Sequence, residues 1–120
     1  MSVNVGMVVE QMWQPVPGGS GRYIVEVASR LAHCGVRAVG ISARHGSGAP
    51  TPGEVGLTIP VRASALPRRA LYAAWDLLGA PGVDRLLTTD SSAPDIIHAT
   101  TWAIQPTSRP LVVTVHDVAF

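Results

Sequence analysis

The chain has 120 residues, of which 47% are hydrophobic and 14% are charged, and its formal net charge is +1. This length suits one domain with a real core, and the small charge argues against nucleic acid as a partner, because nucleic-acid binders carry a concentrated basic face. Cys34 is the only cysteine, so no internal disulfide can form. That suits a reducing cytoplasm, where we expect the protein to reside. All nine basic residues are arginines, which we interpret as the codon bias of a GC-rich bacterial gene.

A glycine-rich segment, PVPGGSGRY at residues 15–23, separates the first predicted strand from the first predicted helix. The strand runs from Val3 to Val9, a nearly continuous apolar stretch that is typical of a strand covered on both faces. The helix follows the glycines, and Gly35 ends it. Glu26 precedes Arg30 by four residues, the favourable order for an ion pair on a helix. The helix has apolar residues at helical spacing, namely Tyr23, Ile24, Val27, Ala28, Leu31 and Ala32.

The rest of the chain alternates between strand and helix patterns. Pro67 begins a second helix, and Val83 to Leu87 form a short helical turn. The predicted inward stripe of the second helix consists of Leu66, Ala70, Leu71, Ala74, Leu77 and Leu78. Further strands are predicted at Val36 to Ser42, Val55 to Val61, Asp95 to His98 and Leu111 to Val115. This alternation predicts an α/β, Rossmann-like fold, a parallel sheet with helices on both faces. If the strand order is the common 3-2-1-4-5, it reverses between the first and fourth strands.

Polar features lie at the carboxyl ends of three predicted strands. The glycine-rich segment follows the first strand, His98 ends the fourth, and His116 follows the fifth. The carboxyl ends of parallel strands meet at one edge of a sheet, where ligands bind beside the point at which the strand order reverses. The sequence therefore predicts a ligand site at this edge.

Clustered glycines before a helix let an anion such as phosphate approach the backbone closely. The dinucleotide-binding pattern G-x-G-x-x-G does not fit, because residues 10–17 separate the strand from the glycines and Ile24 stands where the third glycine belongs. Arg44, after the second strand, keeps an NADP-dependent oxidoreductase open as an alternative. In another alternative the glycines only let a wide loop enter the helix, with Ser20 as its cap.

Several of these segments together resemble the amino-terminal domain of family-four glycosyltransferases. They are Glu10 after the first strand, the proline-bearing loop with PGGSGRY, then DIIHATT and finally PLVVTVHDVAF, in the order that the family has them. The resemblance covers residues 1–120. It implies the incomplete, acceptor-side half of a retaining enzyme of GT-B architecture, whose nucleotide-sugar-binding domain is absent from this sequence. A non-catalytic remnant that serves as an interaction module stays open as an alternative.

The resemblance also implies how the donor is held. Gly18 and Gly19 would approach the diphosphate of a nucleotide-sugar donor, and Arg22 would add positive charge nearby unless it only pairs with Glu26. The acceptor would be a sugar or a lipid-linked sugar acceptor. The sequence has no Asp-x-Asp motif and no metal-ligand spacing among its histidines and Cys34, so we expect neither a metal nor another cofactor.

The remaining site residues come from the ends of the last two strands. The resemblance implies that His116 lies beside the transferred sugar and acceptor, and that Asp117 and His98 line the same cleft. His98 has an alternative as a half-buried, hydrogen-bonded structural residue. Trp102 either stacks on a sugar or covers the core. The two other histidines, His33 and His45, are predicted to be surface residues.

Two surfaces suggest further contacts. Arg68, Arg69, Tyr72 and Trp75 share a helix that would either lie on a membrane or pack on the sheet, and with only two arginines we favour packing. Leu111 to Val115 form a flat β-branched segment that would be a sheet edge, so we expect self-association through it.

Overall fold

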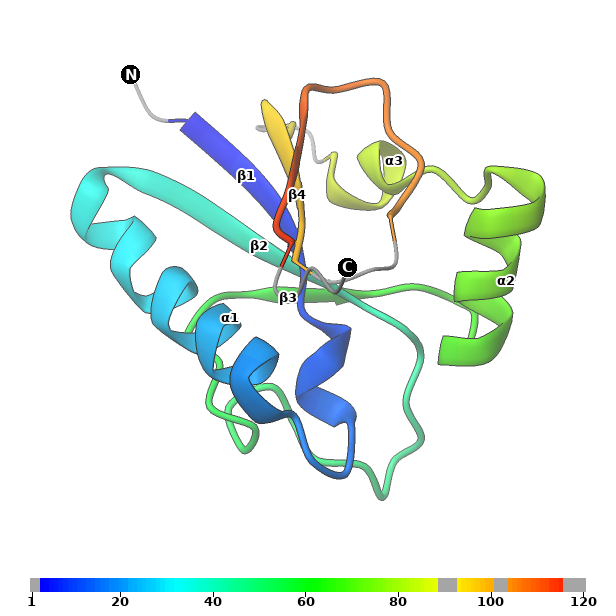
Figure 1. Ribbon diagram of the computed structural model, residues 1–120, viewed down its shortest axis with the longest axis horizontal. Helices are drawn as coiled ribbons and strands as arrows, with labels where there is room; N and C mark the ends of the chain where they lie inside the picture. The colour runs from blue at the N-terminus through cyan, green and yellow to red at the C-terminus, as the bar shows by residue number, and fades with distance from the viewer. Residues whose placement is uncertain (1–2, 89–92, 101–103, 116–120) are drawn as a thin grey trace, which may run out of the picture.

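The computed structural model describes residues 3–88, 93–100 and 104–115. Within them, strands and helices alternate along much of the chain (Figure 1). The strands are β1 (Val3–Val8), β2 (Val36–Ser42), β3 (Val61–Ala63), β4 (Ile96–Ala99) and β5 (Leu111–Val113). The helices are α1 (Gly18–Leu31), α2 (Arg68–Leu78) and α3 (Val83–Leu87), and the short 3-10 helices η1 (Glu10–Trp13) and η2 (Ala32–Cys34) flank α1.

The five strands form one parallel sheet in the order β3-β2-β1-β4-β5. The longest pairing joins β1 to β2, with Val3 opposite Val36 and Val8 opposite Ile41. The order reverses at β1 and β4, so a ligand crevice is expected at the carboxyl ends of these two strands. The predicted α/β Rossmann-like fold is confirmed, and the strand order is the common one on which the expected ligand edge depended.

Helices cover both faces of the sheet, α1 on one side and α2 with α3 on the other (Figure 1). Successive side chains of a strand point to opposite faces. Val8 therefore packs in the cluster beneath α2 and α3, whereas Met7 and Val9 pack with Ile24 and Ala28 of α1. The apolar sequence of β1 follows from burial on both sides, as expected for a central parallel strand.

The two local signals around α1 are confirmed. Gly35 has a φ of 74°, in the left-handed region that favours glycine, and it ends η2, which extends α1. Glu26 pairs with Arg30 on the exposed face at 3.2 Å between carboxylate and guanidinium. A pair this exposed adds little to stability.

The third strand was predicted in the wrong place. It is β3 at Val61–Ala63, and residues 51–60 form turns and loop instead of the strand expected from Val55 to Val61. Thr51 and Glu54 exchange hydrogen bonds across one turn, and Gly56 has a φ of 97°. The apolar residues that suggested a strand serve the α1-side core from these turns, namely Val55, Leu57 and Ile59.

The inward face of α2 was predicted correctly at Leu66 and Leu71 but wrongly at Leu77 and Leu78. Leu71 and Trp75 are buried, whereas Leu77 and Leu78 are 78% and 77% exposed. The large indole of Trp75 is favoured in the core, and its Nε1–H donates to the carbonyl oxygen of Pro81 at 3.1 Å. Because Trp75 faces the sheet, the residues grouped as a membrane-contacting face do not form one exposed surface.

Asp84 of α3 anchors the segment that leads into β5. Its carboxylate accepts hydrogen bonds from the side chain of Thr107 and from the backbone and side chain of Ser108. Burial, the largest single influence, opposes ionisation, but these hydrogen bonds outweigh it and hold the pKa of Asp84 below its usual range. These hydrogen bonds hold the segment before β5 against α3.

Candidate functional site

The glycine-rich segment forms the start of α1, which follows β1 after η1 and a short loop. Gly18 opens the helix with a φ of 67°, a conformation that favours glycine. Nothing lies within 4 Å of a Cβ built on Gly19. No side chain among the described residues caps this helix start, and Ser20 lies inside the helix, so the alternative in which Ser20 caps the helix is wrong. Such an open helix start presents backbone N–H groups that favour an anion.

Gly21, by contrast, is a packing residue. It is buried, and a Cβ built on it would lie 2.4 Å from Cβ of Pro17. We expect Gly21→Ala to lower the free energy of unfolding by about 1–3 kcal/mol, because the proline ring cannot yield without shifting the helix start. Gly19→Ala is the matched control and should be neutral or stabilising by about 0.5 kcal/mol. Urea denaturation measures both, and equal stabilities would contradict the packing role.

Tyr23 of α1 links the helix to the ends of β4 and β5. Its hydroxyl lies 3.0 Å from Oγ1 of Thr114, and Nε2 of His98 lies 2.6 Å from the same atom. The rings of Tyr23 and His98 meet edge to face at 6.1 Å. His98 is buried within β4. This burial and its hydrogen bond fit the alternative in which His98 is a structural residue, and a role in ligand binding stays a prediction. Through Tyr23 and Thr114, the helix that begins with the glycine segment nevertheless contacts His98 at the carboxyl edge of the sheet.

Among the other predicted site residues, Arg22 lies within the described ranges and the rest lie outside them. Arg22 lies exposed on the first turns of α1, and Glu26 is paired with Arg30, as described above. His116, Asp117 and Trp102 lie outside the described residues.

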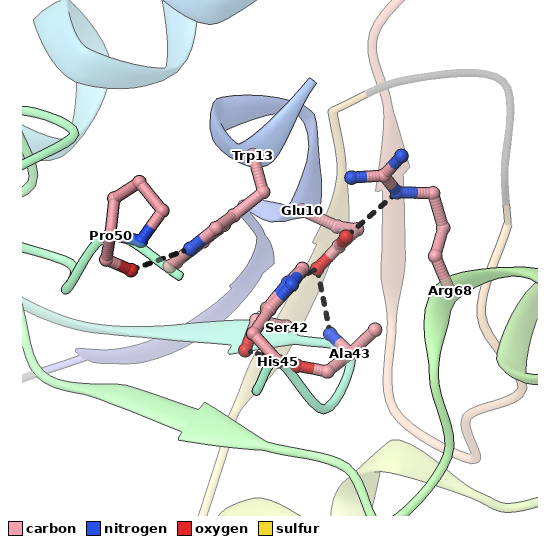
Figure 2. Close-up of polar contacts among 7 residues, drawn as sticks. All are labelled: Glu10, Trp13, Ser42, Ala43, His45, Pro50 and Arg68. Carbon is pink, nitrogen blue, oxygen red and sulfur yellow. Dashed lines mark hydrogen bonds and ion pairs between the residues drawn. The ribbon is translucent and has the colours of Figure 1, made fainter. Parts of the chain in front are cut away.

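Glu10 is the centre of a polar cluster that the sequence did not predict (Figure 2). It is the first residue of η1, two positions after the end of β1, and its side chain is only 1% exposed. Oε1 accepts the backbone N–H of Ala43 at 2.8 Å and lies 2.8 Å from Nε2 of His45. Oε2 accepts Nε–H of Arg68 at 2.8 Å. One carboxylate therefore joins the ends of β1 and β2 to the start of α2.

His45 was predicted to be a surface residue, and this was wrong. Its side chain is 20% exposed, because one edge faces Glu10 and one face stacks on Trp13 at 4.8 Å between ring centroids. The indole Nε1–H of Trp13 donates to the carbonyl oxygen of Pro50 at 2.9 Å. Both rings are therefore held in place (Figure 2).

Tyr72 lies one turn after Arg68 on α2, close to the charges of Glu10 and Arg68. Burial raises the pKa of its phenol far above the usual range, and the negative charge of Glu10 adds to this effect against the opposing charge of Arg68. Tyr72 is therefore a neutral packing partner, stacked on Trp75 at 5.6 Å.

The described ranges contain neither a cluster of metal-binding side chains nor a membrane-spanning helix. In them, no three histidine, cysteine or acidic side chains lie together to hold a metal ion. No described helix has the length and apolar character needed to cross a membrane. Arg44, the residue that kept NADP open, lies exposed after β2.

The parallel sheet, its 3-2-1-4-5 order and the open helix start that follows β1 and η1 define a Rossmann-like α/β domain, a class of fold whose ligands bind at the carboxyl edge of the sheet. Residues 18–120 match the family described as "Glycosyl transferase 4-like domain". Because this match covers most of the chain, the chain belongs to that family. No curated protein and no solved structure matches the chain.

Proposed function

We propose that this domain is the acceptor-side half of a retaining GT-B glycosyltransferase that takes its sugar from a nucleotide-sugar donor. Membership of the family gives the class of reaction, transfer of a sugar to an acceptor. The donor type, the stereochemistry and the two-domain architecture are parts of the proposal.

The observation that carries the proposal is the start of α1. Gly18 adopts a conformation that favours glycine, Gly19 is open to solvent, and no described side chain occupies the first turn as a cap. A diphosphate placed there would meet backbone N–H groups and the positive end of the helix dipole. Arg22 adds an exposed cation on the next turn. Stabilising the departing diphosphate is what retaining transfer requires most.

The acceptor would lie toward β4 and β5 in this proposal. His98 and Thr114 mark that side of the edge in the described residues. His116 and Asp117 follow Thr114 by two and three positions, and the proposal gives them roles beside the transferred sugar. An acceptor hydroxyl held there would need accurate placement more than a strong base.

A titration distinguishes this function from the NADP-dependent alternative. We expect the fluorescence of NADPH to show no saturable binding to the chain at micromolar concentrations, because residues 10–17 replace the tight turn that a dinucleotide needs. Arg44→Ala is the matched variant, since Arg44 is the residue that would read a 2′-phosphate. Micromolar binding that weakens in Arg44→Ala would overturn the proposed function in favour of an oxidoreductase.

Three expectations stay predictions: that the protein is cytoplasmic, that it needs no metal or cofactor, and that it self-associates through Leu111 to Val115. Within the described residues β5 is an edge of the sheet, and Leu111, Val112 and Val113 are 40–49% exposed. Exposed edges of this composition favour pairing with another chain.

A further inference from the structure

The hydroxyl of Thr114 is the meeting point of side chains from α1 and β4. Oγ1 of Thr114 lies 3.0 Å from the hydroxyl of Tyr23 and 2.6 Å from Nε2 of His98. The backbone N–H of Thr114 also donates to the carbonyl oxygen of Ala99 at 3.0 Å. Thr114 directly follows β5, so α1 and β4 together hold the chain at the point where it leaves the sheet.

Packing holds both neighbours of this hydroxyl in place. The ring of Tyr23 packs against the core cluster beneath α1, and His98 is buried within β4. The two rings meet edge to face, with 6.1 Å between their centroids and 88° between their planes. Neither ring can swing away from Thr114 without losing this packing. The three groups therefore form one unit that joins α1 to the carboxyl ends of β4 and β5.

The Thr114 hydroxyl links the state of His98 to that of Tyr23. It has one proton to donate and can also accept. When Nε2 of His98 carries a proton, it donates to Oγ1 of Thr114, whose own proton can then point to Tyr23. When Nε2 carries none, the proton of Thr114 points to His98 and Tyr23 donates to Oγ1. Removing the Tyr23 hydroxyl therefore changes the hydrogen bonding of His98 without touching it.

Thr114 leads directly into the TVHD motif. His116 and Asp117 follow it by two and three positions, and two residues of chain span at most about 7 Å. Fixing Thr114 therefore limits where the backbone of His116 can go. This limit matters for a transfer reaction, because a misplacement of about 1 Å at the reacting centre can lower the rate about a hundredfold.

We propose that Tyr23 is a positioning residue for sugar transfer. Through the hydroxyl of Thr114 it sets the backbone that carries His116 relative to α1. Because α1 begins at Gly18, the same contact fixes the acceptor side of the edge relative to the helix start that would meet the diphosphate. This inference rests on the proposed function, which supplies the roles of His116 and of the helix start. Tyr23 acts through Thr114, so it is not a catalytic residue in this proposal.

NMR of the ¹⁵N-labelled 120-residue chain tests the link itself. Tyr23→Phe and Thr114→Val each remove one hydroxyl and keep the shape of the side chain. Both variants should shift the Nε2 resonance of His98. Ser29→Ala is the matched control, because it removes a hydroxyl from the exposed face of the same helix, and it should leave that resonance unchanged. An unchanged His98 resonance in Tyr23→Phe would overturn the proposal.

Kinetics of a sugar-transferring enzyme that carries this domain test the positioning role. Tyr23→Phe and Thr114→Val should each lower kcat about tenfold with little change in KM for the donor. The double variant should lose no more than either single variant, because both break the same link. Thr114→Ser keeps the hydroxyl and should retain most of kcat. Urea denaturation gives the folded fraction by which each kcat is corrected, so a loss of stability alone does not produce this pattern.

Failure of the positioning role and failure of the proposed function give different results. If Tyr23→Phe turns over as fast as the unsubstituted enzyme per folded molecule, or if the losses of the two single variants multiply, the positioning role is wrong while the proposed function stands. If the unsubstituted enzyme transfers no sugar from any nucleotide-sugar donor, the proposed function is wrong and the positioning role falls with it.

Discussion

Replacing Glu10 with alanine should lower the free energy of unfolding by about 3 kcal/mol or more. The substitution removes one buried acceptor of three hydrogen bonds, from Ala43, His45 and Arg68. The Ala43 N–H is then left buried without a partner, and His45 loses its edge contact. Hydrogen bonds to a charged group contribute about 1.5–3 kcal/mol each. Arg68 can turn toward water because its side chain is 28% exposed, which limits its share of the loss.

Glu26→Ala is the matched control, since it makes the same chemical change at an exposed ion pair on α1. Its expected cost is about 0.3–0.5 kcal/mol. Glu10→Gln should fall between the two, because the amide oxygen still accepts from Ala43 while the amide nitrogen faces a donor. Urea denaturation followed by circular dichroism measures all three. A Glu10→Ala variant as stable as Glu26→Ala would show that the cluster does not hold the three elements together.

Replacing His116 with alanine, in a sugar-transferring enzyme that carries this domain, should reduce turnover about a hundredfold. That factor corresponds to about 2.7 kcal/mol of transition-state stabilisation, typical of a group that positions charge or a hydroxyl at the reacting centre. The expectation rests on the TVHD motif and on the proposed function, because His116 lies outside the described residues. Folded stability should change little if the side chain faces the cleft.

Steady-state kinetics measure this effect, with His33→Ala as the matched control at an exposed position on η2. Comparing kcat with KM shows how His116 acts. If it acts in the transition state kcat falls, and if it acts only in substrate binding KM rises while kcat stays unchanged. If the variant unfolds and its folded fraction turns over normally, His116 is a structural residue and its proposed role is wrong.

The sequence predicted well what depends on neighbouring residues. The apolar run at Val36–Ser42 became β2 with the predicted bounds, and the position of Gly35 gave the end of the first helical unit. The alternation of these local signals was sufficient for the parallel α/β fold, whereas the strand order was assumed as a common arrangement and then found in the structure.

The errors occurred where distant parts of the chain compete for the same space. Val55 and Leu57 have the composition of a strand but pack from turns against the core beneath α1. On α2, Trp75 is buried while Leu77 and Leu78 are exposed. Helical spacing alone could not predict which of these apolar residues would face the sheet.

The Glu10 cluster shows the same limit at the candidate site. The partners of Glu10 lie 33, 35 and 58 residues away, so they meet only once the sheet and α2 are in place. One signal was present in the sequence, an acidic residue directly after a buried strand. A charge there must find partners at the carboxyl edge, because burying it alone is costly.

Calorimetry with a panel of UDP- and GDP-sugars tests the proposed division of the donor site most directly. In our proposal these 120 residues offer the diphosphate only the N–H groups of Gly18 and Gly19 and the charge of Arg22, while the base and ribose are held elsewhere. Such contacts to a solvated anion contribute about 1 kcal/mol each. We therefore expect dissociation constants of about 1 mM or weaker. Micromolar binding of any of these donors would place the nucleotide site within these residues and contradict the acceptor-side assignment.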